Sequence, residues 1–574
     1  MPNRNQESHF ALNPTNIDIS RSTFDRSSSV KTSFNVGQVV PFYLDEVLPG
    51  DTFSVQTSKV VRLQTLLTPI MDNIYLDTYY FFVPNRLTWQ HWRELNGENT
   101  QSAWVPSVEY EVPQITAPAG GWDVGTIADY FGIPTGVSGL SVNAMPFRAY
   151  ALIMNEWFRD QNLQDPLNIP LDDATVVGVN TGNYITDVAK GGKPFVAAKY
   201  HDYFTSCLPS PQKGPDVTIS LGDGTFPVTG NGKSLGLLAG DISRGFASWM
   251  SPTVQTEGSG YSWDLRAGAF NTTLPGGTGS TGAGNAKSGN VVGVPTLEQL
   301  EAKGYDASAS GLIATLDNLS VVTINQLRTA FAIQRMYEKD ARGGTRYIEI
   351  LKAHFGVTSP DARLQRPEYL GGNRVPITIN QVIQQSATAE GSTPQGNTAA
   401  MSLTTDSHDD FTKSFTEHGY VIGLMVARYD HTYQQGLDRL WSRKDRFDFY
   451  WPVFANLGEQ AVKNKEIFAQ GTAVDDEVFG YQEAWADYRY KPNRVTGEMR
   501  SSYAQSLDVW HLADDYDTLP HLSASWIVED PGTVDRVLAV TSSVSNQLIA
   551  DVYVSNRTTR PMPMYSIPGL IDHH

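Results

Sequence analysis

The segments best suited to form β-strands lie near both ends of this 574-residue chain, and this spacing constrains the fold more than any other feature. Residues 53–67 alternate between apolar and polar side chains, a period of two that predicts a strand with one buried face. Residues 74–83, 421–429 and 537–554 are nearly continuous runs of apolar β-formers, which is typical of strands buried on both faces. The sheet must therefore combine strands from both ends of the chain, with long excursions between them. The apolar face of the first strand would comprise Phe53, Val55, Val61, Leu63 and Leu67.

Two segments carry a helical pattern. In the first, Thr323 can cap the N-terminus, apolar residues follow at helical spacing, and Gly343 and Gly344 end the helix. Residues 145–161 are a second, weaker candidate. We expect both helices to pack against the rest of the fold. The apolar stripe of the first would comprise Ile324, Leu327, Phe331 and Met336.

Composition favours an all-β protein with long loops. Aromatic residues make up 11% of the chain, and aromatic rings favour the pleated surface of a sheet. The 49 glycines and 32 prolines indicate many turns, and the single cysteine excludes an internal disulfide. The first residues, MPNRNQESHFALNP, lack the basic start and apolar run of a secretory signal. No apolar run is long enough to span a membrane, so we expect a protein made in the cytoplasm.

The net charge of −18, from 43 basic and 61 acidic side chains, argues against a dedicated nucleic-acid binder. Residues 1–31 hold four basic and three acidic side chains, so no basic arm stands out. Any contact with nucleic acid is therefore expected to be weakly electrostatic, or to depend on a separate basic partner.

Residues 213–317 differ in character from the rest of the chain. Between residues 214 and 293 there are 18 glycines, roughly a fifth of that segment, and no periodicity is visible. A structureless excursion of this length inside a compact fold is uncommon and is usually functional or mobile. We expect a large surface insertion that presents itself to the outside.

The stretch KYHDYFTSCLPSPQKG (residues 199–214) places His201, Asp202 and Cys207 within seven residues, as a thiol active site would. A nucleophilic cysteine needs a base within hydrogen-bond reach and a third group that orients the base. The prolines after Cys207 predict a rigid turn rather than the helix N-terminus that would lower the pKa of the thiol. We therefore expect this aromatic-rich stretch to anchor the chain where it leaves the core.

Motifs for phosphate and metal binding fail on their spacing. The pentapeptide GNGKS (Gly230–Ser234) resembles the end of a phosphate loop, but the motif requires glycine where this chain has Pro227. Asp475–Glu477 and Ala513–Thr518 are acidic, but neither fits an EF-hand loop, so we expect solvated acidic turns. No metal, cofactor or catalytic site is predicted.

Residues 428–451 mix aromatic residues with arginines, the combination on which bases of single strands stack. Acidic side chains nearly balance the basic ones there, so a structural segment held by salt bridges is the favoured interpretation. If the segment meets DNA, the candidate DNA-facing residues are Arg439, Arg443, Lys444 and Arg446.

Five blocks of sequence together resemble one family of proteins. They are PFYLDEVLPGDTF, LLTPIMDNIYLDTYYFFVPNRLTWQHW, HDYFTSCLPSPQKG, ARYDHTYQQGLDRLWSRKDRFDFYWPVFANLGEQ and RPMPMYSIPGLIDHH. These blocks are similar to the major capsid proteins of the small single-stranded DNA bacteriophages, the Microviridae, and most of all to the gokushovirus branch. The resemblance runs from about residue 34 to the C-terminus and fails across 213–317.

The resemblance implies an all-β viral jelly roll with long insertions between its strands. It implies a T=1 icosahedral shell that encloses circular single-stranded DNA, with one chain per asymmetric unit. The expected parts are an N-terminal arm (1–33), a core in two pieces (34–212 and 318–574) and an insertion (213–317) that forms a threefold protrusion. The insertion would contribute to host attachment. Its candidate host-facing residues are Gly222, Gly240, Trp249, Tyr261, Trp263, Gly276 and Gly293.

The resemblance also implies a set of partners in the virion. They are further copies of the chain, the single-stranded DNA genome, an internal scaffolding protein, a small basic DNA-packaging protein, a pilot or minor capsid protein and a bacterial surface receptor.

A secreted glycan-binding or glycan-active β-protein is the alternative interpretation, because 12 tryptophans would suit stacking on sugars. A glycan-active enzyme requires a pair of catalytic carboxylates. The sequence offers neither an isolated acidic pair nor an export signal.

Overall fold

The computed structural model describes residues 20–99, 108–217, 324–385, 395–396 and 398–565, together with four short strands between 228 and 314. The chain divides into two compact units. Met1–Asp216 and Gln334–His574 form the first, and Val217–Ile333 form the second. Most of the glycine-rich segment expected to be an insertion (213–317) therefore falls in the second unit. In that unit β9 pairs with β12 and β10 with β11. Their bounds are β9 (Val228–Gly230), β10 (Leu238–Ala239), β11 (Leu300–Glu301) and β12 (Leu312–Ala314).

The first unit is built around two antiparallel sheets. One has the order β1–β23–β4–β17, with β2 also paired to β23, and the other has the order β13–β5–β18–β3, with β14 also paired to β5. The strands of the first sheet are β1 (Ser22–Asp25), β2 (Ser28–Phe34), β4 (Thr52–Leu63), β17 (Thr404–Ser414) and β23 (Leu548–Arg560). Those of the second sheet are β3 (Val40–Val47), β5 (Ile74–Pro84), β13 (Glu368–Gly371), β14 (Arg374–Pro376) and β18 (Gly419–Tyr429).

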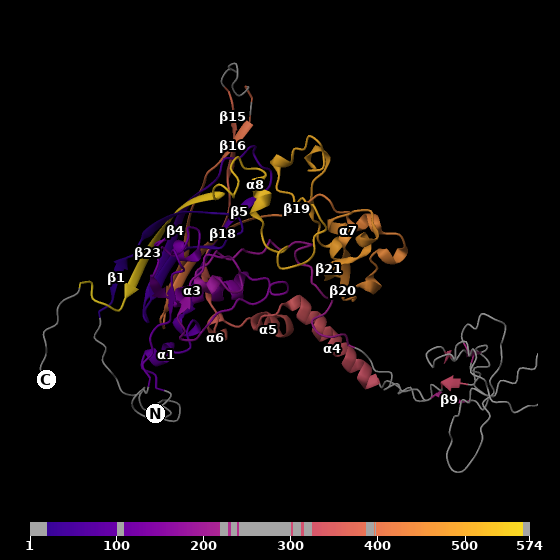
Figure 1. Ribbon diagram of the computed structural model, residues 1–574, viewed down its shortest axis with the longest axis horizontal. Coiled ribbons are helices and arrows are strands. Elements are labelled where there is room, and N and C mark those ends of the chain that lie inside the picture. Colours follow the sequence, from indigo (N-terminus) through magenta and orange to yellow (C-terminus); the bar gives the residue numbers. More distant parts are fainter. Residues whose placement is uncertain are drawn as a thin grey trace, which may run out of the picture. The chain divides into compact units, whose positions relative to one another are not determined.

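Strand order identifies the fold. Along the chain the strands cross repeatedly between the sheets, since β2, β4, β17 and β23 belong to the first and β3, β5 and β18 to the second. Hydrogen-bonded neighbours come from opposite ends of the chain, and in Figure 1 the yellow β23 lies beside the indigo β4. Two sheets of antiparallel strands connected in this way form a jelly roll, and the predicted fold class is confirmed.

The last strand, β23, lies inside the first sheet rather than at its edge. One side of β23 pairs with β4 without interruption, and the other side pairs with β1 and β2. β1 and β2 pair with β23 in the same register. Between these two short strands, the Arg26 N–H donates to the Asn556 carbonyl (2.8 Å). The segment predicted as an N-terminal arm (1–33) therefore contains an edge of this sheet from residue 22 onward.

The main core lies between the sheets and follows the predicted alternation in β4. Phe53, Val55, Val61 and Leu63 are buried there. The prediction was wrong for Leu67, which is exposed. Because β4 ends at Leu63, the period of two no longer determines which way a later side chain points.

β5 and β18 are buried on both faces, as their continuous apolar sequences predicted. Tyr80 and Met425 pack into the core between the sheets. Phe81 and Ile422 pack on the opposite face against the helix α3 (Met145–Ile153), which continues into a short π-helix. A second apolar layer therefore covers the outer face of this sheet.

The prediction for residues 537–554 was wrong in two respects. β23 begins only at Leu548, because the apolar run is interrupted by turn-forming residues before that point. Its side chains then alternate between buried and exposed, so one face of β23 meets solvent. The exposed polar residue Asp551, which pairs with Lys31 across the outer face, marks this alternation.

The two predicted helices differ in how they pack. α3 confirms the second prediction, since most of its residues are buried. α4 (Ile324–Gly343) has the predicted bounds, but Ile324, Phe331 and Met336 of its apolar stripe are exposed, so the expectation that the stripe packs inward was wrong. An amphipathic pattern shows which side chains share a face and does not show what covers that face. No described helix is long and apolar enough to cross a membrane.

Shorter elements complete the described chain. The remaining strands are β6 (Gln114–Thr116), β7 (Ser141–Asn143), β8 (Val176–Val177), β15 (Ile379–Ile383), β16 (Thr398–Ser402), β19 (Thr432–Tyr433), β20 (Glu459–Lys463), β21 (Val478–Glu483) and β22 (Asn493–Arg494). The remaining α-helices are α1 (Trp92–Leu95), α2 (Ile127–Tyr130), α5 (Tyr347–Phe355), α6 (Asp361–Leu364), α7 (Asn464–Ile467) and α8 (Pro531–Asp535).

The position of β23 in the sheet gives a matched test. Leu548 is fully buried, whereas its neighbour Ile549 is 48% exposed on the other face of the same strand. Leu548→Ala should lower the free energy of unfolding by about 2–5 kcal/mol, because it leaves a cavity in the core. Ile549→Ala removes the same number of carbon atoms from the solvent face and should cost about 1 kcal/mol or less. Denaturant unfolding of the unassembled chain measures both, and equal losses would contradict this assignment of faces.

Candidate functional site

The stretch around Cys207 is a structural anchor and not a thiol site. Cys207 is 3% exposed, and its thiol donates to the Tyr203 carbonyl (3.4 Å). Burial, together with the nearby carboxylates of Asp202 and Glu466, raises the pKa of the thiol, so the nucleophilic thiolate is disfavoured. His201 is exposed and is not hydrogen-bonded to this buried sulfur. The predicted structural interpretation is confirmed.

Asp202 holds the anchor together. Its carboxylate accepts hydrogen bonds from the N–H groups of Phe204 (2.9 Å) and Thr205 (2.8 Å) and from the Tyr433 hydroxyl (2.6 Å). The Phe204 ring also packs edge-on against Tyr433, with ring centroids 4.7 Å apart. The chain is thus fixed to β19 shortly before it enters the second unit.

A second polar assembly, which the sequence did not predict, is buried except for one half-buried tyrosine. We call it the buried charge cluster and define it as Lys199, His431, Asp514, Tyr516 and Glu529. The two ring nitrogens of His431 donate to Asp514 Oδ1 (2.9 Å) and Glu529 Oε2 (3.1 Å). Lys199 Nζ (3.5 Å) and the Tyr516 hydroxyl (2.7 Å) contact Asp514 Oδ2. No local signal could have revealed this site, because its members come from segments far apart in the sequence.

The charges of this cluster stabilise one another. Burial alone would lower the pKa of His431, but the carboxylates of Asp514 and Glu529 raise it to about 9. Burial alone would raise the pKa of Asp514, but His431 and Lys199 hold it below its ordinary value. His431 is therefore an imidazolium at neutral pH, and both its nitrogens are engaged by hydrogen bonds to carboxylates.

The location of Asp514 corrects one prediction for Ala513–Thr518. That segment was expected to be a solvated acidic turn, yet Asp514 is buried because His431 and Lys199 neutralise it. The prediction holds for Asp475–Glu477, where the exposed Asp476 binds two lysines. Among the described residues no group of histidine, cysteine or acidic side chains is arranged to hold a metal.

Arg428 belongs to a further internal network. The carboxylate of Asp77 on β5 accepts from Arg374 (2.7 Å), Arg428 (2.6 Å) and the Tyr200 hydroxyl (2.9 Å). The Tyr200 ring lies 4.3 Å from both guanidinium groups. Arg428, the first residue of the segment 428–451 that mixes aromatic residues with arginines and is called the aromatic segment below, thus has a structural role.

The four candidate DNA-facing residues are placed differently. Arg443 forms an ion pair with Asp487, and Arg439 lies 3.8 Å from a Glu466 carboxylate oxygen. Lys444 and Arg446 are exposed, and Arg446 lies over the Phe447 ring at 4.8 Å. Contact of these four residues with DNA stays a prediction. The candidate host-facing residues Gly222, Gly240, Trp249, Tyr261, Trp263, Gly276 and Gly293 lie outside the described residues.

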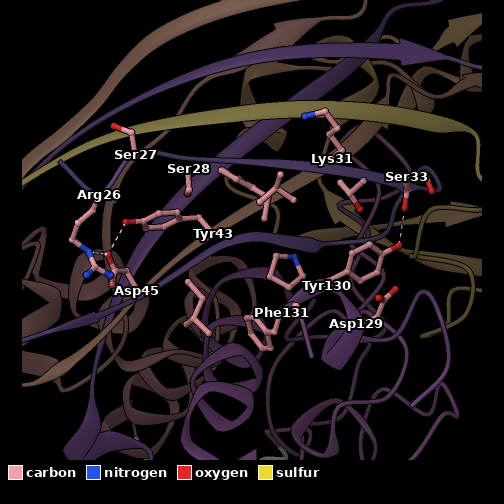
Figure 2. A pocket seen from close by; sticks show the side chains of 16 residues that line it. Arg26, Ser27, Ser28, Lys31, Ser33, Tyr43, Asp45, Asp129, Tyr130 and Phe131 are labelled. Carbon is pink, nitrogen blue, oxygen red and sulfur yellow. Dashed lines mark hydrogen bonds and ion pairs between the residues drawn. The ribbon is translucent and has the colours of Figure 1, made fainter. Parts of the chain in front are cut away.

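A cavity of about 780 Å³ opens between β2, β3 and α2 (Figure 2). Figure 2 shows Arg26, Tyr43 and Asp45 at one end and Ser33 with Tyr130 at the other. Asp45 is held by the Arg26 guanidinium (2.9 Å) and the Tyr43 hydroxyl (3.0 Å). Asp129 is the other carboxylate that lines the cavity, and because Asp45 is paired with Arg26 the two do not form a free carboxylate pair of the kind used in glycan hydrolysis.

A larger cavity of about 1160 Å³ is lined by basic, aromatic and acidic side chains, including Arg159, Arg346 and Arg428 and the carboxylates of Asp160 and Glu349. The Nε atoms of these three arginines are buried and have no hydrogen-bond partner in the described part of the chain. Because these atoms are not accessible and acidic side chains nearly balance the basic ones, the cavity shows no preference for an anion.

Comparison with known proteins decides the family. The profile of the family described as capsid protein (F protein) matches residues 14–570. This chain belongs to that capsid protein family. Its relatives include three proteins named capsid protein VP1. The first, from Spiroplasma virus 4, is 45% identical over 94% of this chain and 93% of its own length.

The other two relatives cover nearly the whole chain. The VP1 of Bdellovibrio phage phiMH2K is 42% identical over 99% of this chain and 98% of its own length. The VP1 of Chlamydia phage 1 is 43% identical over 98% of both chains. The resemblance drawn from the five sequence blocks is thus confirmed. This capsid protein is a structural component of the virion, where copies of it form the shell, and it is not an enzyme.

The buried charge cluster makes stability depend on pH in a defined direction. The pKa of His431 is about 9 in the folded chain, compared with about 6.5 for an unperturbed histidine, so protonation favours the folded state. This contribution is complete below about pH 6.5 and is lost as the pH rises through about 9. The free energy of unfolding should therefore fall by a few kcal/mol across that interval.

Urea unfolding of the unassembled chain on both sides of this pH interval measures the effect. His431→Gln should flatten the pH dependence, although it also lowers stability because it leaves the buried Glu529 without its cation and Asp514 with Lys199 alone. His201→Gln, at an exposed histidine, is the matched control and should keep the slope of the wild type. Equal slopes for His431→Gln and the wild type would contradict the assignment.

Proposed function

We propose that this capsid protein forms a T=1 icosahedral shell around circular single-stranded DNA. The observation that carries the proposal is the match to phage capsid proteins over nearly the full length of the chain, together with the jelly-roll topology. Long connections between the strands supply the extended contact surfaces that permanent assemblies need. Closed symmetry then lets many modest contacts add up to a stable shell.

The charge of the chain supports a separate basic partner for the genome. A net charge of −18 repels phosphates, and internal ion pairs hold Arg374, Arg428 and Arg443. A small basic DNA-packaging protein would neutralise the DNA and lower this repulsion. An internal scaffolding protein, a pilot or minor capsid protein and a bacterial receptor complete the proposed set of partners.

The second unit, which contains most of the glycine-rich segment, is the proposed site of host attachment. Its boundaries, Val217 and Ile333, interrupt the jelly roll between β5 and β13 without removing any strand from either sheet. An insertion separated from the core in this way can vary in sequence while the shell is kept.

Electron microscopy of sedimented native material tests the shell. We expect uniform icosahedral particles with T=1 symmetry that carry nuclease-resistant single-stranded DNA. A monomer or small oligomer, obtained even when the scaffolding protein is co-expressed, would contradict the proposal.

Deletion of Gly222–Gly293 tests the attachment role. The variant should fold and form particles, because all strands of both sheets lie outside the deleted segment. Infectivity should fall strongly, because the proposed attachment surface is gone. Particle yield by sedimentation and plaque titre separate the two effects. Loss of soluble protein, or a titre per particle equal to that of the wild type, would count against this placement.

A further inference from the structure

One surface of the first unit exposes far more apolar area than folding alone requires. We call it the aromatic face and define it as Phe447, Phe449, Tyr450, Trp451, Val453 and Tyr488. The five rings are between 44% and 58% exposed and Val453 is 85% exposed. A Phe, Tyr or Trp side chain buries about 150–250 Å² of surface when it is fully covered. The aromatic face therefore exposes roughly 600 Å², at the upper end of the largest patch on a typical monomer.

The aromatic face is held in place by the fold beneath it. Tyr450 packs edge-on against Trp485 (5.8 Å between ring centroids), and Trp485 is itself buried. The Arg443 guanidinium lies 4.3 Å from the Tyr488 ring and 5.5 Å from the Phe449 ring, and Asp487 fixes this arginine. The rings therefore lose little conformational freedom when a partner binds.

Local turns present these rings outward. Asp445 caps the 3₁₀-helix Arg446–Asp448 by accepting from the Phe447 N–H (2.7 Å). The Asp448 carboxylate closes the same turn by accepting from the Lys444 N–H (2.7 Å). The Trp451 indole N–H donates back to the Arg446 carbonyl (2.9 Å). These hydrogen bonds hold the turn in the conformation that exposes the rings.

Its charge favours a protein partner over DNA. Residues 437–457 contain four basic and three acidic side chains, and Asp487 adds one more negative charge to balance them. A surface without excess positive charge gains little from a phosphate backbone. Exposed aromatic rings around a fixed arginine have instead the composition of the energetic centre of a protein interface.

We propose that the aromatic face docks onto a second copy of this chain in the shell. The proposal rests on the shell-forming function, since a capsid protein must bury surface against its own copies. A stable interface buries about 800 Å² on each partner, and the aromatic face alone supplies most of that area. Repetition around a closed shell gives every copy the same contact.

The proposal is tested by placing a charged residue at the most exposed position of the aromatic face and measuring the yield of particles. Val453→Asp should leave the unfolding midpoint of the unassembled chain unchanged, because Val453 makes little internal contact. It should reduce the yield of particles by about tenfold or more, because it places an unpaired charge in an apolar contact. The matched controls are Val544→Asp and Val124→Asp, at valines that are 80% and 73% exposed elsewhere in the first unit, and these should assemble.

Each other outcome has a defined meaning. Normal particle yield from Val453→Asp overturns the proposal, and so does an equal loss in all three variants. Normal shells with reduced DNA content would also overturn it, and would assign the aromatic face to the genome. If the wild-type chain itself forms no particles, this result contradicts the shell-forming function and not the role of the aromatic face.

A second measurement uses the single native cysteine. Cys207 is buried, so Val453→Cys carries the only accessible thiol among the described residues. This thiol should react with methyl methanethiosulfonate about tenfold more slowly in particles than in the unassembled chain. The same protection is expected in empty particles, where no DNA can provide it. Equal rates in the chain and in empty particles would overturn the proposal.

Discussion

The fold depends on the pairing of β23 with both of its neighbours. This strand from the end of the chain lies between β4 and the edge formed by β1 and β2, so the first sheet is incomplete until the last residues are in place. Contacts of such sequence separation carry a large cost in chain entropy and form slowly. The same arrangement explains how the chain holds a large second unit, because no strand of either sheet lies between β5 and β13.

Charged groups fix the loops to this framework. His431 bridges Asp514 and Glu529, and Arg428 joins the β18 end to Asp77 on β5. Buried ion pairs contribute little net stability compared with apolar packing, but removing one partner is costly. These ion pairs therefore select one conformation of the long loops between the strands, which contain few helices or strands of their own. A shell needs this uniformity, because every copy must present the same contact surfaces.

Features that depend on neighbouring residues in the sequence could be predicted, whereas features that depend on contacts between distant segments could not. The strands β4, β5 and β18 could be predicted because a local pattern of side chains determines which faces are buried. The start of β23 was predicted wrongly, because the prediction joined the apolar residues before Leu548 to the strand across the polar turn that separates them from it. The buried charge cluster was invisible because Lys199, His431 and Glu529 meet only after folding. The resemblance to capsid proteins identified the family where periodicity alone could give only the fold class.

The exposure of apolar side chains also depends on contacts that the sequence alone does not show. Along α4 and on the aromatic face, the described part of the chain leaves apolar side chains exposed that the sequence alone could not show to be uncovered. In a monomeric protein such surfaces promote aggregation. In a shell protein they are the surfaces left for assembly, where weak contacts repeated by symmetry become strong together. The arginines of the aromatic segment were open to two interpretations because sequence does not show which carboxylate each one meets. With Arg443 paired to Asp487 and stacked on rings, the segment is better suited to an apolar protein contact than to a phosphate backbone.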